Sequence, residues 1–129
     1  MAMSAAGVML ATLMAAAPAS DDVTLDIGDT ATMVARGVAL NVPVTYRCTV
    51  PYPDLYVHVI MLHDKRAVWF EGGATPVCDG TSRSVLVRVR VLSGDERFRP
   101  GAGLVQADLY WWPGGRLTAS QEVRIVRGP

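Results

Sequence analysis

The sequence predicts an all-β protein, folded as an antiparallel β-sandwich of about seven to nine strands. After Ser20, apolar residues alternate with polar ones at a period of two, and most of the apolar residues are β-branched or aromatic. Turn residues such as Gly, Pro and Asp interrupt this pattern about every eight to twelve residues. The chain of 129 residues has room for one domain, which we place at residues 20–129.

The two clearest strands are residues 40–48 and 82–93. In each of them alternate side chains are apolar, which predicts one buried face. Residues 55–62 are apolar on both faces, as is typical of a central strand. The side chains expected in the core are Leu40, Val42, Val44, Tyr46, Cys48, Val57, Val59, Met61, Val85, Val87, Val89 and Val91. Shorter strands are expected at residues 23–27, 32–36 and 67–71.

The last two strands, residues 105–112 and 117–126, are joined by a Trp-Pro-Gly-Gly segment that is typical of a type II turn. If Trp111 faces the core, Tyr110 and Trp112 face outward, because neighbouring strand residues point to opposite sides. Large exposed aromatic side chains are enriched where proteins bind partners or sugars. Tyr110 and Trp112 are therefore the candidate binding residues. The alternative is that a loop or arginine side chains cover them.

Residues 1–19 differ from the rest of the chain and predict a signal peptide. The first twenty residues carry no charge, and the apolar run at residues 5–14 is too short to span a bilayer but suits a secretory signal. Ala17 and Ala19 supply an A-x-A site, so we expect cleavage after Ala19. The alternative is a helix that packs on the domain. Cleavage would leave no stable membrane span, and the protein would be secreted or lie in the cell envelope.

The chain has two cysteines, Cys48 and Cys78. We expect them to form a disulfide, because no reducing pool protects thiols outside the cytoplasm. Closing a loop of about 30 residues stabilises a fold by about 3 to 4 kcal/mol in the chain-entropy model. In antibody domains the second cysteine lies in the penultimate strand, whereas Cys78 precedes the strand at residues 82–93. The bond is therefore expected to tie a strand end to a loop.

Residues 45–48 (Thr-Tyr-Arg-Cys) and 77–80 (Val-Cys-Asp-Gly) resemble segments of small secreted actinobacterial immunoglobulin-like proteins of unknown function. In that family one cysteine ends an early strand, the second precedes an Asp-Gly turn, and a Gly-Gly pair lies shortly upstream, as Gly72 and Gly73 do here. The resemblance covers roughly residues 23–126. It implies export and an immunoglobulin-like sandwich, and it carries no catalytic or binding residue that could be transferred.

Motifs for catalysis are missing from the sequence, which has no G-x-S-x-G nucleophile motif and no phosphate-binding glycine loop before a helix. The two histidines, His58 and His63, lie five residues apart on one strand and so point to opposite faces, which prevents them from sharing a metal unless a bulge lies between them. The alternative is a weak two-ligand site formed by His63 and Asp64 at the strand end. Twelve basic and twelve acidic residues cancel, so the chain lacks the positive field that attracts nucleic acid. We expect no cofactor, no metal, no nucleic-acid partner and no enzymatic activity.

The sequence favours a secreted, non-enzymatic binding module for an unknown protein or glycan, with the sheet face around Tyr110 and Trp112 as its site. The alternative is a small-molecule carrier or enzyme with a cleft between two sheets, on which His58, Glu71 or Asp108 would converge. A deep pocket that holds two of these residues would favour the alternative, and a solid core would argue against it.

The export hypothesis makes a prediction about the mass of the secreted protein. We expect the mature chain to lack residues 1–19, and we expect thiol alkylation to add no mass until the protein is reduced. Intact mass spectrometry under oxidising and reducing conditions measures both. A secreted protein that keeps residues 1–19, or that has two free thiols, would contradict the hypothesis.

Overall fold

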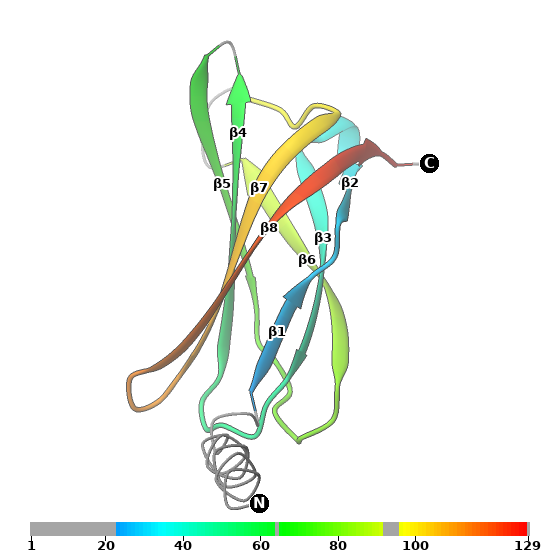
Figure 1. Ribbon diagram of the computed structural model, residues 1–129. Coiled ribbons are helices and arrows are strands. Elements are labelled where there is room, and N and C mark those ends of the chain that lie inside the picture. Colours follow the sequence, from blue (N-terminus) through cyan, green and yellow to red (C-terminus); the bar gives the residue numbers. More distant parts are fainter. Residues whose placement is uncertain (1–22, 64, 92–95, 129) are drawn as a thin grey trace, which may run out of the picture.

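The computed structural model describes residues 23–63, 65–91 and 96–128, and these residues form an all-β fold (Figure 1). The described part of the chain contains eight strands, which confirms the predicted class and strand number. They are β1 (Thr24–Ile27), β2 (Thr30–Val34), β3 (Ala39–Arg47), β4 (Asp54–His63), β5 (Arg66–Ala74), β6 (Arg83–Val91), β7 (Gly101–Trp111) and β8 (Gly115–Arg127), with a short 3-10 turn, η2 (Ala35–Gly37), between β2 and β3. The expected signal peptide, residues 1–19, lies outside the described residues.

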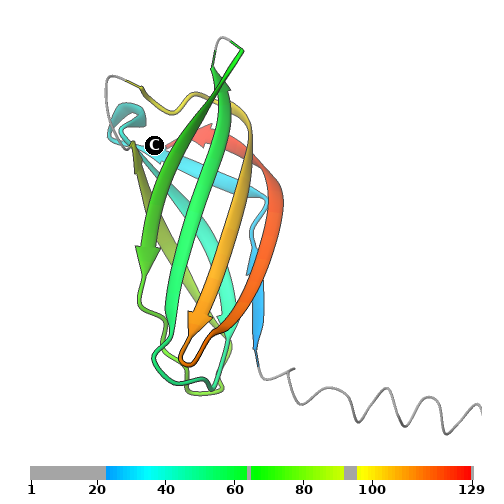
Figure 2. The ribbon, with the colours of Figure 1, turned by 90° about the vertical axis from the view of Figure 1, so that its left-hand side faces the viewer.

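The strands form one sheet that closes on itself (Figure 2). Around the ring the order is β3, β2, β8, β7, β4, β5 and β6, and β6 pairs with β3 again. The ladder between β3 and β6 is long, whereas β5 and β6 pair only at Phe70 with Val91 and at Glu71 with Arg90. The all-β fold is as predicted, but seven of the strands form one closed, barrel-like sheet, where a sandwich would have two separate sheets. Closure leaves fewer unpaired strand edges than an open sandwich has.

The contact between β5 and β6 depends on Gly72. A Cβ atom at this position would overlap the carbonyl group of Arg88 and would lie 3.0 Å from the Cα atom of Val89. Because glycine has no side chain, the backbones of β5 and β6 can approach closely enough to pair a few residues away. The first glycine of the Gly-Gly pair that stands out in the sequence thus has a structural role in closing the ring.

β1 and β2 pair with successive parts of β3, at residues 44–47 and 39–41 respectively. Between these two ladders, the carbonyl oxygen of Pro43 accepts a hydrogen bond from the Gly28 N–H group at 2.9 Å. Pro43 has no N–H group of its own, and its place in mid-strand is tolerated because the chain crosses there from β1 to β2. β2 then pairs in parallel with β8. The sheet therefore differs from the prediction, which was wholly antiparallel.

The turn after β2 differs from the strand predicted at residues 32–36. Ala35, Arg36 and Gly37 have positive φ angles of 50°, 58° and 88°. Successive left-handed residues cannot continue a strand, so β2 stops before its predicted end. The Phe98 N–H group donates a hydrogen bond of 2.8 Å to the Gly37 carbonyl and so holds the turn against the segment before β7.

The interior of the ring is filled by apolar side chains that point inward from every strand. All the predicted inward residues of β3 and β4 are buried, which assigns Val57, Val59 and Met61 of the ambiguous strand to the core. On β6, Val87 and Val89 are buried. The two outer members of the predicted β6 series, Val85 and Val91, are only half-buried. The prediction of alternating inward residues is thus confirmed for the middle of each strand.

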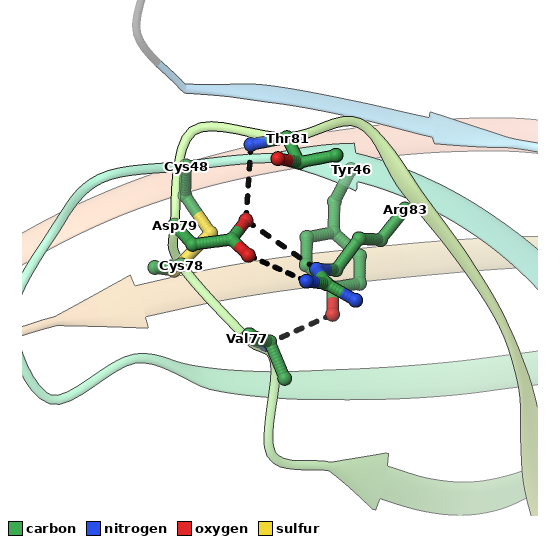
Figure 3. The surroundings of a disulfide bond; sticks show 7 residues. All are labelled: Tyr46, Cys48, Val77, Cys78, Asp79, Thr81 and Arg83. Atoms are coloured by element: carbon green, nitrogen blue, oxygen red, sulfur yellow. Dashed lines mark hydrogen bonds and ion pairs between the residues drawn. A yellow bond between two sulfur atoms is a disulfide. The ribbon is translucent and has the colours of Figure 1, made fainter.

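Cys48 and Cys78 form the predicted disulfide (Figure 3). Cys48 directly follows β3, and Cys78 lies in the loop between β5 and β6, so the bond ties a strand end to a loop as expected. The Tyr46 hydroxyl, whose ring is buried, accepts a hydrogen bond of 2.9 Å from the Val77 N–H group. A second hydrogen bond, of 2.8 Å, joins the Gly80 N–H group to the Cys48 carbonyl. The loop is therefore held to β3 by covalent and hydrogen bonds together.

Asp79 lies beside the disulfide and organises the rest of this loop (Figure 3). Its carboxylate accepts a hydrogen bond of 3.0 Å from the Thr81 N–H group and forms an ion pair with Arg83 at the start of β6. The hydrogen bond from Arg83, followed by that from Thr81, lowers the pKa of Asp79 to about 2. The Arg83 guanidinium therefore helps to hold this loop against the start of β6.

The close approach at Gly72 makes a prediction about stability. We expect Gly72→Ala to lower the free energy of unfolding by about 1 to 3 kcal/mol, because the new methyl group must displace the backbone of β6. Gly73→Ala is the matched control, since a Cβ atom there would make one tight contact, 3.1 Å from the Leu55 carbonyl oxygen, without overlapping the backbone of β6. Urea denaturation followed by circular dichroism measures both. Equal effects of the two substitutions would contradict the proposed role of Gly72.

Candidate functional site

The two candidate binding residues lie at the end of the molecule that carries the disulfide, near the tip of the β7–β8 hairpin (Figure 1). Tyr110 is 37% exposed and Trp112 is 67% exposed, whereas Trp111 packs in part against the core. The three side chains therefore alternate as predicted. The Trp112 N–H group donates a hydrogen bond of 3.3 Å to the Pro51 carbonyl, which holds the hairpin against the loop between β3 and β4.

The local sequence explains the shape of this hairpin. Trp111 pairs with Gly115, and residues 112–114 make the turn. Gly114 has a φ of 76°, a conformation that glycine adopts at little cost. The Trp111 indole lies over Gly115, where any Cβ atom would overlap the ring. Each glycine of the predicted turn thus has a separate reason to be glycine.

Tyr110 belongs to a larger surface formed by the outward side chains of β5, β4, β7 and β8, which we call the outer face. Cross-strand pairing arranges these side chains in rows, because paired residues on one face of a sheet lie about 5 Å apart. Ile60 of β4 pairs with Trp69 of β5 on one side and with Leu104 of β7 on the other. Leu62 extends this row along β4. Together these four residues form the apolar patch.

The apolar patch is exposed on a face where a monomeric sheet would ordinarily carry polar side chains. Leu62 is 75% exposed, Trp69 is 54% exposed and Leu104 is 47% exposed. Sequence reasoning missed Trp69 and Leu104 as site residues. Alternation could have placed both outward, since each precedes a residue of the core, Phe70 or Val105. It could not have shown that they are neighbours, because that depends on the register between strands.

Toward the disulfide, the outer face becomes polar and aromatic. Here Tyr56 and His58 stack with 4.6 Å between ring centroids, and both contact Glu71 of β5. The Tyr56 hydroxyl donates a hydrogen bond of 2.5 Å to one carboxylate oxygen of Glu71, and the other oxygen lies 3.5 Å from His58 Nε2. The hydrogen bond to Glu71 is the main cause of the raised pKa of Tyr56. The Glu71 carboxylate therefore has two partners within the protein.

Asp108 is the buried charge of this region. It belongs to the outward series of β7, yet it is only 1% exposed. Its carboxylate accepts hydrogen bonds from Gln106 (3.2 Å), Arg116 (3.2 Å) and Thr118 (2.5 Å). Burial alone would raise the pKa of Asp108, but the bonds from Thr118, Gln106 and Arg116 outweigh burial and lower it. Arg116 also lies over the Tyr110 ring, 5.5 Å from its centroid.

The alternative hypothesis from the sequence was a cleft between sheets that holds His58, Glu71 or Asp108. The structure brings His58 and Glu71 together, and Asp108 lies near them in the next row of the outer face. All three, however, are outside the ring and not in its interior. Inward positions on these strands are occupied by buried apolar residues such as Val57 and Ala107, and these three side chains do not converge there as the alternative hypothesis required.

Neither a metal cluster nor a membrane-spanning helix is found within residues 23–63, 65–91 and 96–128. No group of three or more His, Cys, Asp or Glu side chains is close enough there to hold a metal ion. No helix in this part of the chain is long and apolar enough to cross a membrane.

Comparisons with known proteins give distant structural likenesses. No family model and no curated protein matches the sequence. Murine CRIg is 12% identical over 83% of this chain and 98% of its own, with a TM-score of 0.43. Spo0M, a sporulation control protein from Bacillus subtilis, is 15% identical over 81% of this chain, with a TM-score of 0.36, and the match covers 48% of the Bacillus protein. These likenesses assign neither a family nor a function.

The buried carboxylate of Asp108 makes the next prediction. Asp108→Asn keeps the shape of the side chain but removes its charge, and we expect it to lower the free energy of unfolding at neutral pH by about 1 to 3 kcal/mol. The folded-state pKa of Asp108 is below its ordinary value of 3.8. The stabilisation is therefore present above that value and is lost as the pH falls through the folded-state pKa.

Urea denaturation across a series of acidic pH values checks this prediction. Asp26→Asn is the matched control, because Asp26 is an exposed aspartate on β1. We expect the difference between wild type and Asp108→Asn to shrink toward low pH, and we expect the control to show little difference at any pH. A pH-independent difference, or equal effects of the two substitutions, would contradict the assigned role of Asp108.

Proposed function

We propose that this protein is an exported binding module without catalytic activity, and that it takes a protein partner on its outer face. The observation that carries the proposal is the apolar patch, in which Trp69, Ile60 and Leu104 lie side by side on three paired strands. Aromatic and aliphatic side chains that remain exposed together are typical of the centres of protein interfaces. A tryptophan at such a centre often contributes a large share of binding energy.

The polar part of the outer face supports a protein partner over a glycan. Sugar recognition needs hydrogen-bonding groups that are free to meet hydroxyls, but the two carboxylates beside the Tyr56–His58 stack already have partners within the protein. Glu71 has Tyr56 and His58 as partners, and Asp108 accepts three hydrogen bonds. These contacts hold Tyr56 and Arg116 in fixed positions. A fixed surface loses less conformational entropy on binding than a mobile one.

Tyr110 and Trp112 extend this surface toward the disulfide end. Tyr110 shares a row with Asp54 and Arg116, which supplies charge of both signs beside the aromatic ring. Trp112 is more exposed and lies in the turn. We assign both residues to the rim of the interface, where truncation costs less than at the centre.

Export is supported by the disulfide, since such bonds persist in oxidising compartments. The signal peptide at residues 1–19, the location outside the cytoplasm and the relation to the secreted actinobacterial proteins are predictions from the sequence. The alternative function, a carrier or enzyme with a cleft between sheets, has less support because apolar side chains occupy the interior.

A comparison of surface variants tests the proposal. The oxidised protein is immobilised and exposed to the extracellular fraction of a culture of the source organism. We expect the double variant Trp69→Ser, Leu104→Ser to retain its partner about tenfold less well than wild type or worse, because both central side chains are lost. Trp112→Ala should weaken retention less.

The matched control is Leu86→Ser on β6, because Leu86 is 63% exposed but lies away from the outer face. It should bind as wild type does, and all variants should unfold at similar urea concentrations. Equal retention by the control and the double variant would contradict the assigned face. Retention that survives proteolysis of the bound material but is lost after periodate oxidation would contradict a protein partner and indicate a glycan.

A further inference from the structure

A pocket of about 710 Å³ is lined by residues 33–36, 98–100 and 127–128. The C-terminal ends of β2 and β8, which contribute to it, lie at the end of the molecule opposite the β7–β8 turn (Figure 1). The charged side chains of the pocket are Arg36, Arg99 and Arg127, and we call it the arginine pocket. Met33, Phe98 and Pro100 form much of the apolar part of its wall. The arginine pocket shares no lining residue with the outer face, so a ligand bound in it would be independent of the protein partner proposed for that face.

Three contacts bring these arginines together from distant parts of the sequence. Arg36 precedes Gly37, whose carbonyl accepts the hydrogen bond from Phe98, and Arg99 directly follows Phe98. A Cβ atom at Gly37 would lie 2.7 Å from the Phe98 carbonyl oxygen, so the two segments touch through their backbones. Arg127 is fixed by the parallel pairing of β8 with β2, in which it lies opposite Met33. The cluster is therefore set by backbone contacts.

The three arginines of the pocket form no ion pair with another described residue. Arg66, Arg83 and Arg116 each form an ion pair with a carboxylate. By contrast, no ion pair of Arg36, Arg99 or Arg127 is found in the described part of the chain, and no carboxylate is among the lining residues of the pocket. Three guanidinium groups beside an apolar wall attract an anion, because arginine binds carboxylate, sulfonate and phosphate oxygens through paired hydrogen bonds.

The backbone at one edge of the pocket is strained. Ala35 and Arg36 have positive φ angles of 50° and 58°, although neither is glycine. Residues other than glycine seldom adopt this conformation, and where they do they often lie at binding sites. Arg36 of this turn lines the pocket together with Phe98 and Arg99.

We infer that the arginine pocket binds a small organic anion, with its carboxylate, sulfonate or phosphate group held by Arg36, Arg99 and Arg127. The apolar body of the ligand lies against Met33 and Pro100. Phe98, which also lines the pocket, is buried and packs on Phe70 with 4.1 Å between ring centroids, so this part of the wall is anchored in the core. The pocket has the size of sites that take small molecules of this kind.

Anilinonaphthalene sulfonate, an aromatic anion whose fluorescence rises on binding, is the probe for this site. Titration of the oxidised full chain should show saturable binding that weakens as ionic strength increases. Arg36→Gln, Arg99→Gln and Arg127→Gln should each weaken binding by about tenfold, because each removes hydrogen bonds to a charged group. Arg88→Gln on β6 is the control and should bind as wild type does, since Arg88 is exposed and not part of the pocket.

N-phenylnaphthylamine, which has the same apolar body without the sulfonate, separates charge recognition from apolar adhesion. We expect it to bind more weakly than the sulfonate and with no dependence on the three arginines. The inference is overturned if the sulfonate binds the three pocket variants and the Arg88 variant equally. It is also overturned if the uncharged compound binds as tightly as the sulfonate, or if wild type does not bind the sulfonate.

Discussion

Closure of the sheet around an aliphatic core is the constraint on which the rest of the structure depends. β6 pairs with β3 on one side and reaches β5 on the other, so the inward side chains of seven strands share one enclosed interior. Gly72 makes the second contact sterically feasible. Because the interior is filled, every group that could recognise a ligand must lie on the outside of the ring or at one of its two ends.

The outer face, which lies outside this closed ring, is polar at one end and apolar at the other. Polar side chains at the disulfide end bind one another, so Asp108 can be buried without an uncompensated charge. At the other end of the face, Ile60 has only apolar cross-strand neighbours, Trp69 and Leu104. The arginine pocket uses a different part of the ring, where the turn after β2 meets the segment before β7. The fold thus offers two independent surfaces of different chemistry.

Much of the core could be predicted from the sequence, because alternation is a local pattern that each strand displays by itself. Val42, Val59 and Val87 are buried for that reason. The disulfide was likewise predictable, since the chain has only two cysteines. Closure of the sheet and the parallel pairing of β2 with β8 were not predictable, because both depend on which strands become neighbours.

The candidate site shows the same division between local and long-range information. The outward direction of Tyr110 followed from alternation, and the structure agrees. The burial of Asp108 depends on Arg116 and Thr118 of the next strand, and the patch around Ile60 depends on the register of three strands. Single-strand patterns contain neither fact. The arginine pocket was even less predictable from the sequence, because its charges come from three separate segments.

Nuclear Overhauser effects between backbone protons of neighbouring strands test the closed ring most directly. A closed ring should give cross-strand effects between Val42 and Val87 and also between Phe70 and Val91, together with slow amide exchange in the middle of β6. Effects between β3 and β6 without any between β5 and β6, accompanied by rapid exchange of the β5 amides that face β6, would show an open sandwich and contradict the account.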